Sequence, residues 1–148
     1  MYYPPVITRL YVNNFRCLEN FELPISGHSS ALLIGKNGSG KTTVGRALAI
    51  LQTIARGVNR VSDLVKPKDF SCGRTDAPMR FEIEVALEAK TYSYDIAFEF
   101  PEGFKELRVL EEKLTVNRKP VYTRELAQVH LTRMGKEQED LPNPAFLP

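Results

Sequence analysis

One segment constrains this chain more than any other. Residues 35–42 read Gly-Lys-Asn-Gly-Ser-Gly-Lys-Thr, which fits the pattern G-x-x-x-x-G-K-[ST]. Gly35, Gly38 and Gly40 permit backbone conformations that turn successive N–H groups into one concavity, where a β-carbon would collide with phosphate oxygens. The same N–H groups lie at the start of a helix, whose dipole favours an anion. The pattern therefore predicts a loop that binds the phosphates of a nucleoside triphosphate, with a strand before it and a helix after it.

The side chains of this loop have separate expected roles. Lys41 would place its ammonium against the β- and γ-phosphates and stabilise their charge, and the Thr42 hydroxyl would bind Mg²⁺. Thr43 is placed to hydrogen-bond the α-phosphate. Lys36 is expected to be a solvated charge, whereas Asn37 is either a turn former or a polar group facing the γ-phosphate. The predicted ligands are ATP and Mg²⁺, and the predicted loop residues are Gly35, Lys36, Asn37, Gly38, Ser39, Gly40, Lys41, Thr42 and Thr43.

Hydrophobic periodicity assigns structure to both sides of the loop. Ala31–Ile34 is an apolar run without alternation, as expected of a strand buried on both faces. After the loop, apolar residues recur at three- and four-residue steps, which predicts an amphipathic helix that ends near Gly57. Upstream, Val6–Tyr11 and Phe21–Ile25 are predicted to be two paired strands. Residues 58–79, which contain prolines and a glycine, are expected to form a surface excursion rather than core.

The clearest β signal lies in the second half of the chain. Within residues 81–100, apolar and polar side chains alternate in two runs, and the short link between them predicts an antiparallel hairpin. Residues 107–116 change phase partway, which predicts a β-bulge near Val109–Leu110. A turn at Asn117–Pro120 leads into residues 121–131, which are expected to form a return strand. The loop and its helix are therefore predicted to pack with an antiparallel β-meander, in a mixed α/β (α+β) fold.

The net charge, the cysteines and the apolar stretches indicate which partners and which cellular compartment to expect. The formal net charge of +2 gives no support to nucleic-acid binding through bulk charge, although residues 56–80 are locally basic. Cys17 and Cys72 have no metal-ligand or paired spacing and are expected to be reduced. The first residues lack the pattern of a signal peptide, and the longest apolar stretch is too short to span a bilayer. The expected compartment is cytoplasmic, with no membrane partner.

Two motifs together resemble a known family. Asn14-Phe15-Arg16, followed about twenty residues later by the loop at 35–43, looks like the amino-terminal lobe of ABC-type ATPases, in particular the SMC/RecF/OLD-like branch of AAA-family bacterial ATPases. The similarity of layout covers most of residues 6–131. The resemblance implies ATP bound between two heads, so that a second copy of the head closes over the γ-phosphate. It also implies that Arg16 approaches the nucleotide phosphates or base.

The chain departs from that family where hydrolysis is concerned. ABC-type hydrolysis needs a strand of four apolar residues ending in Asp-Glu, and Val109-Leu110-Glu111-Glu112 supplies only two leading apolar residues. No Leu-Ser-Gly-Gly-Gln-like signature is present either. No complete catalytic set is therefore expected, beyond charge stabilisation by Lys41. We expect an ATP-binding lobe over residues 1–134, an incomplete part of a larger ATPase, and a linker or frayed tail over residues 135–148.

Other functions stay open from the sequence. The first hypothesis is that the chain is the amino-terminal half of an ATPase head that acts on DNA or on an effector protein. The alternative is an interaction module that responds to nucleotide without cleaving it. A GTPase is disfavoured because Asn117-Arg118-Lys119-Pro120 does not match the guanine-reading Asn-Lys-x-Asp. A small-molecule kinase is disfavoured because its loop type continues in alternating helices and parallel strands, whereas this chain continues in antiparallel runs.

Overall fold

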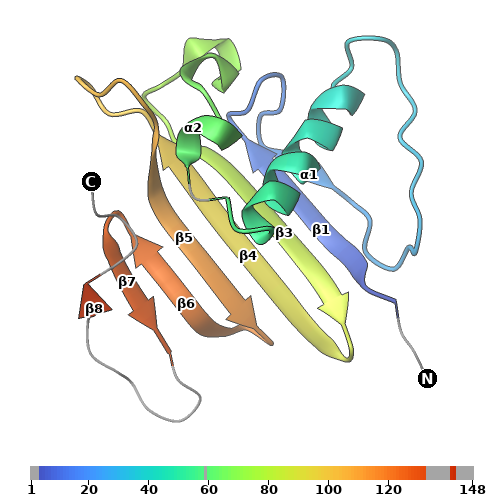
Figure 1. Cartoon of the computed structure of the whole chain (residues 1–148). Helices are drawn as coiled ribbons and strands as arrows, with labels where there is room; N and C mark the ends of the chain where they lie inside the picture. The colour runs from blue at the N-terminus through green and yellow to red at the C-terminus, as the bar shows by residue number, and fades with distance from the viewer. Residues whose placement is uncertain (1–3, 59, 133–140, 143–148) are drawn as a thin grey trace.

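The computed structural model describes residues 4–58, 60–132 and 141–142, which form one antiparallel sheet with a helix across one face (Figure 1). The strand order is β2-β1-β3-β4-β5-β6-β7-β8, and every neighbouring pair is antiparallel. The strands are β1 (Val6–Asn13), β2 (Phe21–Leu23), β3 (Met79–Leu87), β4 (Lys90–Glu99), β5 (Arg108–Val116), β6 (Lys119–Glu125), β7 (Gln128–Leu131) and β8 (Leu141–Pro142). The helical segments are α1 (Lys41–Ala55), α2 (Val61–Leu64) and the 3₁₀ turns η1 (Pro67–Asp69) and η2 (Ser71–Gly73).

The meander predicted from alternation is confirmed, and its turns explain the tight connections. Glu88 and Ala89 join β3 to β4 with φ angles of 49° and 61°. Asn117 and Arg118 join β5 to β6 with φ angles of 50° and 64°. Two central residues with positive φ suit the right-handed twist of a two-residue hairpin. The predicted pairing of the first two strands is also confirmed, because β2 pairs antiparallel with β1.

The predicted β-bulge is confirmed at the expected place. Ala97 lies opposite Glu111, but the next residue of β4, Phe98, lies opposite Val109, so the ladder passes over Leu110. The Leu110 carbonyl instead accepts a hydrogen bond from Leu126 N at 2.9 Å. The change of phase in the sequence therefore marks a residue that belongs to the strand but not to its alternation.

The expectation of a single return strand over residues 121–131 was wrong, because this segment forms two strands. The segment forms a second hairpin, in which β6 and β7 are joined around Leu126, whose φ is +52°. Its weak alternation reflects this reversal, because each arm is short and neither contains a buried residue. Of the predicted tail over residues 135–148, only the backbone of β8, paired with β7, lies within the described residues.

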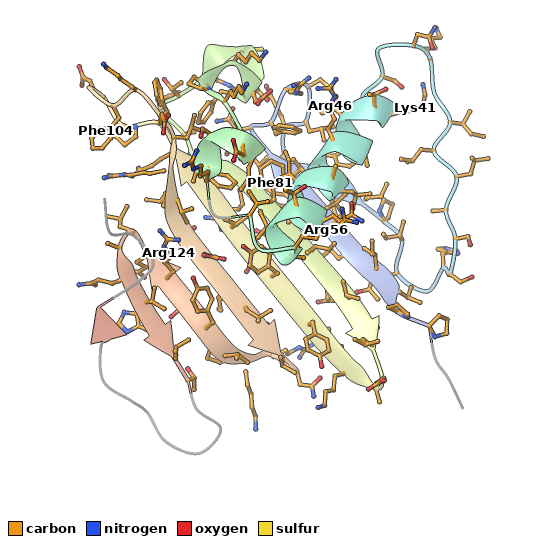
Figure 2. All side chains as sticks on the ribbon, viewed as in Figure 1. Lys41, Arg46, Arg56, Phe81, Phe104 and Arg124 are labelled. Carbon is orange, nitrogen blue, oxygen red and sulfur yellow. The ribbon has the colours of Figure 1, made fainter. Side chains whose placement is uncertain are left out.

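The core lies between α1 and the sheet. The helix phase is as predicted, since Val44, Ala47 and Leu51 are buried. Phe81 stands at the centre of an aromatic row: its ring centroid is 5.1 Å from that of Phe15 and 6.1 Å from that of Phe98, both edge-on. Figure 2 labels Phe81 on the sheet beside α1. Across the described residues, no helix has the length and hydrophobicity that a membrane span requires.

The surface excursion expected over residues 58–79 was wrong in part. α2 and the two 3₁₀ turns bring large side chains inward, and Val65 and Phe70 are 1% and 3% exposed. Phe70 also forms an isolated β-bridge with Phe15. The prolines and glycine of this stretch build tight turns, and the few apolar residues between them have no periodicity that would reveal their burial.

The buried strand expected at Ala31–Ile34 was also wrong. These residues form no strand in the structure, and the side chains of Leu32 and Ile34 are 82% and 85% exposed. β1 has β2 on one edge and β3 on the other, so this run cannot pair with β1. Figure 1 shows the segment before α1 as a long loop that stands away from the sheet. An apolar run predicts burial only where a neighbouring strand can pair with it.

Candidate functional site

The glycine-rich loop leads directly into the amino terminus of α1. Gly40 is the N-cap residue of the helix, with φ 93°, and no side chain caps the helix start. The first turn of α1 contains no acidic residue. The first intrahelical bond runs from Val44 N to Gly40 O at 2.9 Å, so the preceding amides have no carbonyl partner within the helix. This end of α1 therefore offers unpaired donors and the positive end of a dipole.

Each of the three glycines meets a different backbone or space requirement. Gly38 and Gly40 have φ angles of 84° and 93°, which L-residues with a β-carbon rarely adopt. A β-carbon on Gly35 would lie 2.6 Å from Ser39 Oγ, and one on Gly40 would lie 3.2 Å from Cys17 Sγ. The curvature of the loop therefore depends on glycine at all three positions.

Lys41 lies at the first position of α1, and its side chain folds back over the loop. Its ammonium donates to the carbonyl oxygens of Gly35 and Lys36, the second at 2.7 Å, and to Ser39 Oγ at 3.3 Å. Figure 2 shows Lys41 at the end of α1 that joins the loop. A cation thus lies within the curve of the loop, held only by neutral acceptors. A phosphate oxygen, which carries charge, would be a stronger acceptor for the same ammonium.

The other predicted loop residues lie at the mouth or along the first helical turn. Lys36 and Asn37 are exposed, and Ser39 N bonds Lys36 O at 3.1 Å, which closes a tight turn through Asn37 and Gly38. Thr42 is exposed, so its hydroxyl is open to solvent. Thr43 is half-buried, and its Oγ1 accepts from Cys17 Sγ at 3.5 Å.

Arg16 lies on a neighbouring turn, and its guanidinium is bound elsewhere than the loop. Arg16 Nη2 lies 2.8 Å from Asp69 Oδ1, and the backbone N of Arg16 donates to Asp69 O at 2.7 Å. Arg16 also lines a hollow of about 260 Å³ beside α1, together with Arg46 and Asp69. The nine predicted loop residues thus form one continuous site at the start of α1. Arg16 lies close to this site, because the next residue, Cys17, contacts Gly40 and Thr43. The guanidinium of Arg16 is paired with the carboxylate of Asp69 rather than directed at the loop.

Two contacts of this region were not predicted from the sequence. Cys17 lies against Gly40 and Thr43, and buried Asp69 binds Arg16. Pro67 could have signalled the 3₁₀ turn that contains Asp69, since proline favours the first position of a helical turn. Nothing in the spacing of Arg16 and Asp69 could have signalled their ion pair. Within the described residues, no group of three or more His, Cys, Asp or Glu side chains could hold a metal ion.

A second hollow of about 800 Å³ lies between α1 and the open face of the sheet, and none of the predicted loop residues lines it. Its lining is mostly apolar, with one polar cluster: Tyr94 Oη and Tyr122 Oη donate to the two carboxylate oxygens of Glu112 at 2.6 and 2.8 Å. Burial, and then the hydrogen bond to Glu112, raises the pKa of Tyr122 to about 12. The pKa of Tyr94 is raised by the same two causes.

Comparisons with known proteins bear on the loop and on the sheet. A family model described as the AAA ATPase domain matches residues 6–140. An "OLD nuclease" of Thermus scotoductus is 44% identical over 46 residues. The aligned part is 31% of this chain but only 8% of the Thermus protein, so the chain spans a small part of that relative's length.

Proposed function

This chain belongs to the AAA ATPase domain family, and from that premise we propose that it binds Mg·ATP through the loop Gly35–Thr42 and the first turn of α1. Membership of an ATPase family implies nucleotide binding. The position of the site and the roles of its residues are our inference. The observation that carries the proposal is the bend from Gly38 to Gly40, where two left-handed residues precede a helix start with no capping side chain.

The residues of the loop fit a triphosphate with its magnesium ion. A β-carbon on Gly38 would meet nothing within 4 Å, so the space beside this residue is open to phosphate oxygens. Lys41 would bind the β- and γ-phosphates, Thr42 would coordinate Mg²⁺ and Thr43 would donate to the α-phosphate. The metal would neutralise charge on the phosphates, and its other ligands would be water and phosphate oxygens.

We further propose that the chain acts as the amino-terminal half of an ABC-type, SMC/RecF-like ATPase head. In such a head, hydrolysis needs acidic residues and a signature loop that this sequence lacks, supplied by a further lobe and by a second copy. The exposed run Ala31–Ile34 supports this proposal, because it has the composition of a buried strand but no strand beside it in this sheet. A strand from a further lobe would cover it.

Equilibrium binding of a fluorescent ATP analogue, with and without Mg²⁺, tests the site. The expected pattern is loss of binding in Lys41→Ala and loss of the Mg²⁺ effect in Thr42→Ala. Lys90→Ala is the matched control: it removes the same charge from an exposed position at the start of β4, outside the loop, and should change affinity little. Equal affinity in Lys41→Ala and Lys90→Ala would refute the proposal.

The second candidate is an interaction module that binds nucleotide without cleaving it. It is favoured by the first turn of α1, which contains no carboxylate, and by the lack of a metal-binding acidic cluster in the described part of the chain. ATP hydrolysis by the purified chain on the order of 1 s⁻¹ or more would lie in the range of complete enzymes. Such a rate would contradict both this candidate and the proposal that the chain is the amino-terminal half of an ATPase head. DNA or an effector protein as partner of the intact head remains part of the first proposal.

A further inference from the structure

A buried carboxylate outside the loop carries an inference about how the loop is held in place. We propose that Asp69 is a positioning residue of the nucleotide site: through Arg16 it holds the turn of residues 14–18 against Gly40 and the start of α1. The inference rests on the proposed function, because it concerns the affinity of that same loop for nucleotide.

Asp69 has more partners than an ordinary loop residue. It is 6% exposed, although it lies in a segment rich in charged residues. Its Oδ2 accepts from Lys66 N at 3.0 Å, and its Oδ1 lies 2.8 Å from Arg16 Nη2. Its backbone carbonyl accepts from Arg16 N at 2.7 Å. A buried carboxylate is tolerated when it is paired and hydrogen-bonded, and here Arg16 supplies the charge.

The turn that Asp69 holds has a backbone that needs outside support. Asn14 and Arg16 have φ angles of 56° and 53°, a region that costs free energy for residues with a side chain. Reciprocal bonds between Phe15 and Leu18 close the turn, at 3.1 and 2.8 Å. From the other side, Asn14 Nδ2 donates to the carbonyls of Arg74 and Ala77. Residues 66–77 therefore bond Asn14 and Arg16, the two residues of this turn that have positive φ angles.

The far side of the same turn lies against the loop. Cys17 Sγ is 3.5 Å from Thr43 Oγ1, and both Cys17 and Leu18 lie within contact distance of the position that a β-carbon on Gly40 would occupy. Gly40 is the residue directly before α1 and its N-cap. A shift of the turn would therefore change the packing beside the residue that orients the first amides of the helix.

The test compares Asp69→Asn with Asp63→Asn. Both substitutions remove one negative charge from the same segment, but Asp63 is exposed. Asp69→Asn should weaken binding of the fluorescent ATP analogue on the order of tenfold, the size of effect that loss of an outer-shell partner has in metal sites. Asp63→Asn should bind as the parent does. Equal affinity in the two variants, with binding still lost in Lys41→Ala, overturns this inference and leaves the proposed function standing.

Thiol chemistry supplies a readout that a loss of global stability would not move. In a Cys72→Ser background, Cys17 is the one remaining thiol, and it is already exposed in the native state. Asp69→Asn should raise its rate of reaction with a thiol reagent several-fold without nucleotide, whereas Asp63→Asn should not. An unchanged rate in Asp69→Asn contradicts the inference.

If Asp69→Asn does not fold, the reaction rate of Cys17 can instead be measured in the Cys72→Ser background without the Asp69 substitution. Saturating Mg·ATP should slow the reaction of Cys17, because Cys17 lies against Gly40 and Thr43, beside the proposed phosphate site. A rate that is indifferent to saturating nucleotide overturns the inference. A lack of nucleotide binding in both the parent and Lys41→Ala would instead be a failure of the proposed function.

Discussion

Cys17 lies directly beside Gly40, and a β-carbon on Gly40 would come within 3.2 Å of Cys17 Sγ. The glycine is thus required twice, by this contact and by its φ of 93°. Among the glycines that the structure describes, Gly40 alone combines both demands, and it lies at the junction of the loop and α1.

Gly40→Ala should therefore lower both stability and nucleotide affinity. The left-handed backbone alone costs about 1–2 kcal/mol for a residue with a β-carbon. Urea unfolding should show this loss, and binding of the fluorescent ATP analogue should weaken because relief of the strain displaces the first amides of α1. Retention of full affinity in Gly40→Ala would contradict this prediction.

Gly45→Ala is the matched control for that substitution. Gly45 lies inside α1, and a β-carbon there would have nothing within 4 Å. Alanine in a helix interior is favoured over glycine by about 1 kcal/mol, so Gly45→Ala should stabilise the chain by up to that amount. Its nucleotide affinity should stay as in the parent.

The cluster of Tyr94, Tyr122 and Glu112 predicts a loss of stability at high pH. The folded pKa of Tyr122, about 12, lies above its ordinary value of 10, so the folded state favours the neutral phenol. That contribution is complete below pH 10 and is lost as the pH rises through about 12. Tyr122→Phe should reduce the dependence of the unfolding free energy on pH in this window. An unaltered pH dependence in Tyr122→Phe would refute the prediction.

Because the apolar run Ala31–Ile34 is exposed, polar substitutions in it should have little effect on stability. Leu32→Ser with Ile34→Ser should change the unfolding free energy by no more than about 0.5 kcal/mol, as is usual for surface positions. Leu10→Ala, at a fully buried position, should cost about 2–5 kcal/mol. Urea unfolding of the two variants gives the comparison. A loss above 2 kcal/mol in the serine variant would show that the run is packed after all.

Sequence patterns predicted the elements whose structure depends on near neighbours. The alternation in residues 81–100 gave the β3–β4 hairpin, and the phase change at Leu110 gave the bulge. The apolar spacing of α1 gave its buried face. The resemblance to the OLD-like branch of AAA-family ATPases, stated from Asn14-Phe15-Arg16 and the loop, is confirmed by the family match and by the Thermus relative.

Features that depend on distant partners were not predictable in this way. Ala31–Ile34 reads as a buried strand, but burial requires a strand beside it, and that depends on the topology of the whole sheet. Asp69 lies in residues 58–79, which were expected to form a surface excursion, but it is buried and paired with Arg16, more than fifty positions earlier in the sequence. The fold thus follows from local periodicity, whereas the surroundings of the site follow from long-range contacts.

The order of strands in the sheet has a kinetic consequence. From β3 to β7 each strand pairs with its neighbour in sequence, but β1 pairs with β3 across the entire segment between them. Because long-range closure costs more chain entropy than a hairpin, we expect the meander to form first and β1 to join it late. The glycine bend, which β1 and its following turn support, would then acquire its shape after the folding barrier. A nucleotide that binds that bend should accordingly slow unfolding much more than it speeds refolding.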